Sequence, residues 1–126
     1  MEIKPAKAMH HLLRVVDDWR SEYHSKQNGD IVFQNKELKS NIFFTSASLH
    51  TIAKHSTGFE NIPLVLMKPD EVWMRWEDTT SQEVVLRNYI KFGKLSYVVQ
   101  TRNGVVTDAF AVSNTAANNF RKGVIA

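Results

Sequence analysis

Apolar residues near the start of the chain recur at helical spacing. They stand three or four positions apart, with charged residues between them, as an amphipathic helix requires. This pattern predicts a helix over residues 5–26, ended by the Asn28-Gly29 pair, which supplies left-handed backbone conformations. A short strand at 31–34 and a polar loop at 35–40 follow. The apolar positions of the helix are Met9, Leu12, Leu13, Val16, Trp19 and Tyr23.

The middle of the chain predicts one strand and two helices. Residues 41–45 form a compact strand, and Thr45 or Ser46 is a suitable N-cap for a helix that runs to about residue 56. A shorter helix spans residues 61–67, closed by a Lys-Pro-Asp sequence, because proline disfavours a helical residue before it. The first of these helices carries His50, Lys54 and His55.

The last part of the chain predicts antiparallel sheet, with strands over 71–77, 84–92, 95–102 and 105–112. Gly93-Lys94 and Asn103-Gly104 stand between consecutive strands as two-residue hairpin loops, and Asn-Gly is a strong hairpin signal. A last helical turn, capped by Ser113 or Asn114, ends at Phe120. Helices first and sheet after predict the α+β class, with N-terminal helices packed on a four-stranded antiparallel meander.

Five polar side chains converge in this predicted sheet. Two-residue loops place Arg87 opposite Gln100 and Gln100 opposite Thr107, and antiparallel partners project to the same face. The set is free of acids, which favours a phosphate ligand. The alternative is an ordinary sheet with one solvated face. The set consists of Arg87, Tyr89, Lys91, Gln100 and Thr107.

Composition narrows the class of protein. With 126 residues, 43% of them hydrophobic, we expect one domain. A net charge of +3 is compatible with a polyanionic partner. The chain has no cysteine, which excludes disulfides, thiolate metal sites and thiol catalysis. No stretch has the roughly 18 apolar residues of a membrane span, so we expect a soluble chain without a membrane partner.

The histidines favour proton transfer over metal binding. His50 and His55 are five positions apart, which separates them by more than a right angle on a helix and argues against a zinc site. Lys54 beside His55 is a better candidate, because a cation next to an imidazole near a phosphate can tune acid–base chemistry close to neutral pH. Arg121 and Lys122 follow the last strand and either bind a phosphate or solvate a terminus.

Several stretches resemble the barnase, EndoU, colicin and RelE-like nuclease group, in particular its phage and polymorphic-toxin branch. The resemblance covers about residues 41–123, whereas residues 1–40 carry a helix and a loop. It implies a single nuclease-like domain over 1–126. The stretches are "IFFTSASLHTIAKH", "IPLVLMKPDEVW", "NYIKF", "YVVQTRNGVVTDAF" and "FRKG".

What the resemblance implies is an endoribonuclease without metal or cofactor, with its site on the open face of the sheet. The RNA 2′-hydroxyl is the nucleophile in such enzymes and a 2′,3′-cyclic phosphate is the product. Some cut tRNA, and many are toxin domains neutralised by an immunity protein. Such a domain acts in the bacterial cytoplasm, delivered within a larger secreted or virion protein. The rivals are a nucleic-acid-binding module without chemistry and an accessory domain of a phage head.

The resemblance also implies roles for particular residues. His55 matches the helix histidine of the group and would exchange protons, although the paired loop histidines of the EndoU type are missing here. Lys91 and Tyr89 match its strand residues, and Thr107 its hydroxyl residue. These four are the expected catalytic residues, and those expected to bind substrate are Lys54, Arg87, Gln100 and Arg121.

Overall fold

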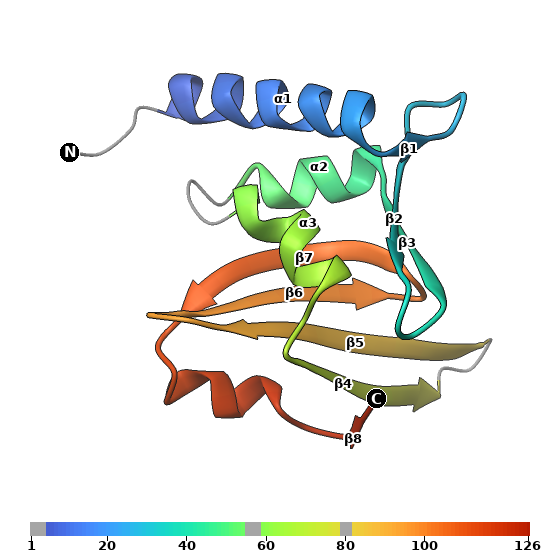
Figure 1. The fold of residues 1–126 in the computed structure, drawn as a ribbon, viewed down its shortest axis with the longest axis vertical. Coiled ribbons are helices and arrows are strands. Elements are labelled where there is room, and N and C mark those ends of the chain that lie inside the picture. The colour runs from blue at the N-terminus through green and yellow to red at the C-terminus, as the bar shows by residue number, and fades with distance from the viewer. Residues whose placement is uncertain (1–4, 55–58, 79–81) are drawn as a thin grey trace.

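The computed structural model describes residues 5–54, 59–78 and 82–126. Three helices, α1 (Pro5–Glu22), α2 (Ser46–Ile52) and α3 (Ile62–Met67), lie on one side of a β-sheet, and the 3₁₀ helix η1 (Phe59–Asn61) leads into α3. A second 3₁₀ helix, η2 (Ala116–Phe120), lies on the other side of the sheet (Figure 1). We call these two sides the helix face and the open face.

The sheet is mixed and has eight strands in the order β1-β2-β3-β7-β6-β5-β4-β8. Within the described residues, the strand pairings are antiparallel except that of β3 with β7, where Phe43 lies beside Val105. The α+β class is therefore confirmed. The predicted sheet of four strands was too small, because the sheet has eight. The strands are β1 (His24–Ser25), β2 (Ile31–Asn35), β3 (Ser40–Phe44), β4 (Glu71–Asp78), β5 (Glu83–Phe92), β6 (Ser96–Arg102), β7 (Val105–Val112) and β8 (Val124–Ile125).

The helical spacing of the first segment reflects packing against aromatic residues of the sheet. Trp19 of α1 is 4% exposed and meets Phe33 and Phe44 edge-on, with ring centroids 5.8 and 5.3 Å away. Tyr23 meets Phe33 in the same way at 5.0 Å. Such pairs stabilise a core beyond the area they bury. They fix α1 over β2 and β3, and α1 ends four residues earlier than predicted because the chain enters β1.

Helix α2 is held at its start by two hydroxyl residues. Thr45 is its N-cap and accepts a hydrogen bond from the backbone N–H of Ser48, while the Ser48 hydroxyl accepts one from the N–H of Thr45. This capping box satisfies backbone donors that a helix start leaves open. The Ser48 hydroxyl also donates to the Val106 carbonyl at 2.6 Å, which ties α2 to β7.

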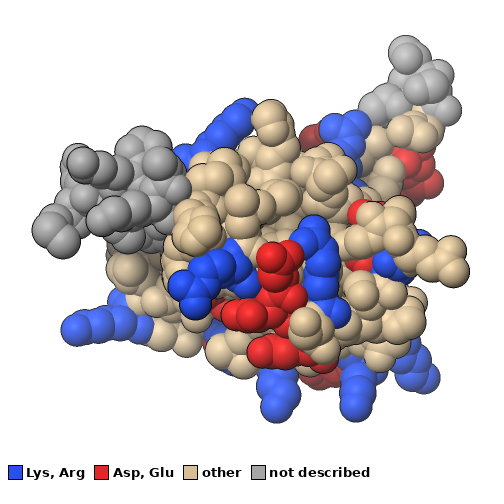
Figure 2. Space-filling model, turned by 90° about the horizontal axis from the view of Figure 1, so that it is seen from above, with Lys and Arg blue, Asp and Glu red and all other residues tan. Residues whose placement is uncertain are grey.

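Two further observations bear on the class of protein. Among the described residues, no helix has both the length and the apolar character needed to cross a membrane. The surface over α1 mixes charges, with Asp and Glu side chains beside Lys and Arg (Figure 2). One such pair joins Arg20 and Asp17 at 2.7 Å. That surface is therefore not a uniformly basic patch for a polyanion.

Candidate functional site

The register between β5 and β6 differs by one residue from the prediction. Phe92 pairs with Ser96, so the hairpin loop has three residues rather than two, and the Gly93 N–H donates to the Leu95 carbonyl at 3.0 Å. A shift of one residue in a single strand moves its side chains to the other face relative to its partner. The predicted convergence of five polar side chains is therefore wrong. Three of the five lie on the helix face: Arg87, Tyr89 and Lys91.

Each of these three side chains is engaged within the protein. Tyr89 is 0% exposed in the hydrophobic core, so no substrate can contact it. Arg87 is half-buried and donates to the Met74 sulfur at 3.1 Å and to the Tyr89 hydroxyl at 3.4 Å. Lys91 donates to the Lys68 carbonyl at 2.7 Å. We conclude that these residues serve the helix–sheet contact.

The predicted proton-transfer pair is only partly described. Lys54 is exposed and lies just beyond the C-cap of α2, where its N–H donates to the Thr51 carbonyl at 3.2 Å. His55 lies outside the described residues. The role assigned to His55 therefore rests on the sequence alone.

Gln100 and Thr107 do come together on the open face, by a route that the sequence did not indicate. Gln100 pairs with Asp108, not with Thr107, because a β-bulge interrupts the β6–β7 ladder. Thr107 is the extra residue of β7, and its hydroxyl donates to the Gln100 carbonyl at 3.2 Å. Bulges commonly re-aim a side chain next to a functional site. Here the bulge keeps Thr107 beside Gln100.

A cavity of about 130 Å³ lies at this place on the open face. Its lining comes from four neighbouring strands, and two exposed cations stand at its rim. These are Lys122 of the C-terminal segment and Arg75 of β4, whose guanidinium makes only a long contact, of 4.0 Å, to the exposed Glu77 carboxylate. No acidic residue lines it within the part of the chain that the structure describes. The lining residues are Trp73, Arg75, Leu86, Asn88, Gln100, Thr101, Thr107 and Lys122.

One wall of this cavity belongs to the C-terminal segment, residues 113–126, which folds back across the open face. The Asn88 amide donates to the Phe120 carbonyl at 3.0 Å, and Phe120 meets Phe110 of β7 with ring centroids 4.9 Å apart. Beyond η2, Gly123 (φ +101°) lets the chain lie against β4, since a Cβ there would overlap the Met74 carbonyl oxygen. The segment thereby brings Lys122 to the cavity.

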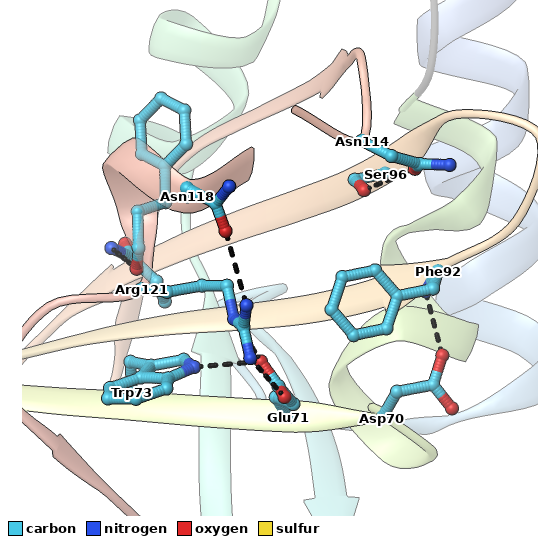
Figure 3. Close-up of polar contacts among 10 residues, drawn as sticks. Asp70, Glu71, Trp73, Phe92, Ser96, Asn114, Asn118 and Arg121 are labelled. Atoms are coloured by element: carbon cyan, nitrogen blue, oxygen red, sulfur yellow. Dashed lines mark hydrogen bonds and ion pairs between the residues drawn. The ribbon is translucent and has the colours of Figure 1, made fainter. Parts of the chain in front are cut away.

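Arg121 anchors this segment rather than pointing freely into solvent. Its guanidinium makes two hydrogen bonds to the Glu71 carboxylate, at 2.6 and 2.8 Å, and one to Asn118 at 3.2 Å (Figure 3). The guanidinium also lies 5.7 Å from the ring centroid of Trp73, whose indole N–H donates to Glu71 at 2.9 Å. The prediction that Arg121 binds substrate is therefore not supported, because its guanidinium already binds the Glu71 carboxylate.

The Arg121–Glu71 contact predicts a pH dependence of stability. Hydrogen bonds from Arg121 lower the pKa of Glu71 from its ordinary value of 4.5, although burial opposes them. A carboxyl with a lowered pKa stabilises the fold above its unfolded-state pKa and loses this contribution as the pH falls through the folded-state pKa. In Glu71→Gln, we expect a loss of about 1 kcal/mol at neutral pH, kept small by solvent screening.

Thermal unfolding of wild type and Glu71→Gln between pH 7 and pH 3 measures this effect. The difference between the two proteins should be largest near neutral pH and shrink below pH 4.5. A difference that stays constant over this range would show that the charge of Glu71 does not hold the segment.

Sequence reasoning predicted Gln100 and Thr107 as site residues, but it did not predict how the other residues of the cavity join them. Trp73, Asn88 and Gln100 are direct neighbours across β4, β5 and β6, and the alternation of strand residues would have revealed this had the register been right. Lys122 stands in the quoted "FRKG" stretch, but its position depends on the path of the C-terminal segment. Within the described residues, no three His, Asp or Glu side chains are placed to hold a metal ion.

Comparison with known proteins gives one match. A family model described as phage-Barnase-EndoU-ColicinE5/D-RelE like nuclease2 matches residues 18–126. No curated protein and no solved structure matched the chain. The matched region begins within α1 and includes all of the sheet. The resemblance predicted from the sequence is thereby confirmed, and the chain belongs to the family of phage-Barnase-EndoU-ColicinE5/D-RelE like nucleases.

Proposed function

We propose that the protein is an endoribonuclease that holds its substrate in the cavity on the open face. The observation that carries the proposal is the lining of that cavity, with two exposed cations, Arg75 and Lys122, at the rim and no acid among its described lining residues. A phosphodiester is an anion that such a rim attracts, and cations fixed beside it stabilise the charge that grows on its oxygens during cleavage. The family supplies the class of reaction, that of a nuclease.

The chemistry we propose uses the RNA as its own nucleophile. The 2′-oxygen forms a bond to the adjacent phosphorus while the bond from phosphorus to the 5′-oxygen breaks, which leaves a 2′,3′-cyclic phosphate. The 2′-hydroxyl must lose a proton and the 5′-oxygen must gain one. Lys122 is the rim ammonium that can donate to the 5′-oxygen, and His55 remains the sequence-based candidate for accepting a proton.

The test is incubation of purified protein with total bacterial RNA and with tRNA in the presence of EDTA. We expect short products ending in a 2′,3′-cyclic phosphate, identified by mass spectrometry, and loss of cleavage in His55→Ala if that imidazole transfers a proton. Cleavage of neither RNA, with or without added divalent ions, would overturn the proposal. Retention of RNA on a gel without cleavage, weakened by salt, would instead indicate the binding module.

The same activity suggests a biological role as a toxin domain. An enzyme that cuts cellular RNA arrests growth when it is expressed in bacteria, whereas a binding module or a phage-head accessory domain need not. The partner that fits this role is an immunity protein that covers the cavity. Expression from an inducible promoter, with and without the gene next to it, tests both points.

A further inference from the structure

We propose that the cavity on the open face receives a single pyrimidine base, and that Gln100 determines this specificity. The inference rests on the proposed function, because the base would belong to the nucleotide whose phosphate lies at the cationic rim. It is carried by the size of the cavity, by the chemistry of its walls and by the amide groups of Asn88 and Gln100 that line it.

The size of the cavity corresponds to one six-membered ring. Its volume is about 130 Å³, and an apolar protein cavity of about 150 Å³ accommodates benzene. A pyrimidine is a six-membered ring with small substituents, whereas a purine has a second fused ring. The volume therefore favours a pyrimidine.

The walls combine apolar surface with amide groups, as a heterocyclic base requires. Trp73 and Leu86 are half-buried and supply apolar contact. The indole of Trp73 is held in place by its hydrogen bond to Glu71. A fixed aromatic ring is a suitable surface for a base, since base–aromatic contact stabilises binding whatever the base. Discrimination between bases must then come from the polar groups.

Two amides provide these polar groups. The Asn88 nitrogen donates to the Phe120 carbonyl, which fixes the orientation of the amide and leaves its oxygen as an acceptor. The Gln100 side chain, also half-buried, has no hydrogen-bond partner among the described residues. An amide offers one acceptor and two donors. An acceptor from Asn88 and a donor–acceptor pair from Gln100 can bind the edge of uracil or cytosine. Purines also present donors and acceptors, but in a cavity of about 130 Å³ the second ring keeps a purine from reaching Gln100.

The Gln100 amide remains available for a ligand. It is half-buried rather than buried, so water can satisfy it in the free protein and a ligand can replace that water. The two exposed cations and the two half-buried amides line the same cavity. A base among the amides would thus leave its phosphate next to Arg75 and Lys122, as a nucleotide requires.

Cleavage of an RNA that contains all sixteen dinucleotide steps measures the specificity. We expect wild type to cut after pyrimidines at least about ten-fold faster than after purines, because a matched pair of hydrogen bonds discriminates between bases by this order. In Gln100→Leu this ratio should fall below about three-fold. Gln34→Leu is the matched control, since Gln34 is an exposed strand residue in β2 and its replacement should leave the ratio unchanged.

Calorimetric binding of cytidine 3′-monophosphate and adenosine 3′-monophosphate separates this inference from the proposed function. Tighter binding of the cytidine nucleotide, lost in Gln100→Leu, supports the base site even if the protein does not cleave RNA. Cleavage without a base preference, or a preference that survives in Gln100→Leu, overturns the base site and leaves the ribonuclease standing. If neither nucleotide binds and RNA is not cut, the cavity holds water only and both proposals fail.

Discussion

Replacing Tyr89 with alanine should destabilise the protein by about 3–5 kcal/mol, while replacing it with phenylalanine should leave RNA cleavage unchanged. Tyr89 is 0% exposed and belongs to the core beneath the helices. Loss of its ring would leave a cavity in close-packed surroundings, which is the costly kind of core substitution. Tyr89→Phe removes only the hydroxyl, whose contact with Arg87 is long at 3.4 Å.

Urea unfolding of the two variants gives the free energies, and the RNA cleavage assay gives the activities. This pair of variants separates a structural tyrosine from the catalytic tyrosine that the family resemblance implied. A folded Tyr89→Phe protein that has lost cleavage would show that the hydroxyl reaches the substrate, and would contradict the burial of this residue.

The second large effect concerns the rim of the cavity. Arg75→Ala and Lys122→Ala should each reduce RNA cleavage by about 100-fold or more, the loss typical of removing one donor that stabilises charge in the transition state. Both side chains are exposed, so neither substitution should change the free energy of unfolding by more than about 0.5 kcal/mol. Arg14→Ala is the control, because Arg14 is an exposed cation on α1.

The measurement is the rate at which wild type and the three variants cleave a short RNA substrate at two salt concentrations. Arg14→Ala should cleave like wild type at both concentrations, which would exclude a mere effect of net charge. Equal rates for all three variants and wild type would show that the phosphate does not lie at this rim, and the site would have to be sought elsewhere on the surface.

The hairpin between β6 and β7 was predictable because its turn residues adopt the conformations that they favour. Asn103 (φ 50°) and Gly104 (φ 81°) both have the positive φ of a type I′ turn, and Arg102 pairs with Val105 as expected. The hairpin between β5 and β6 was not predictable in this way. Gly93 does not adopt positive φ, so no two-residue primed turn forms there.

The site was predictable only where it depends on local alternation. Gln100 and Thr107 belong to one hairpin, and its predicted turn places them close together even though a bulge pairs Gln100 with Asp108. Lys122 and Trp73 depend on two non-local events, the return of the C-terminal segment and the pairing of β4 with β5. Neither leaves a periodic signal in the sequence. Lys91 and Arg87 were misplaced because one extra loop residue changed the face of their strand.

The parallel contact between β3 and β7 has a consequence for how the protein folds. Strands β4 to β7 are joined by short connections and pair with their neighbours in the chain, so they can form early and locally. The β2–β3 hairpin pairs with them where Phe43 lies beside Val105, two residues far apart along the chain. Bringing Phe43 and Val105 together closes a long loop, and the chain loses conformational entropy before the contacts that stabilise this arrangement can form. We expect docking of the amino-terminal half to be the slow step that sets the folding rate.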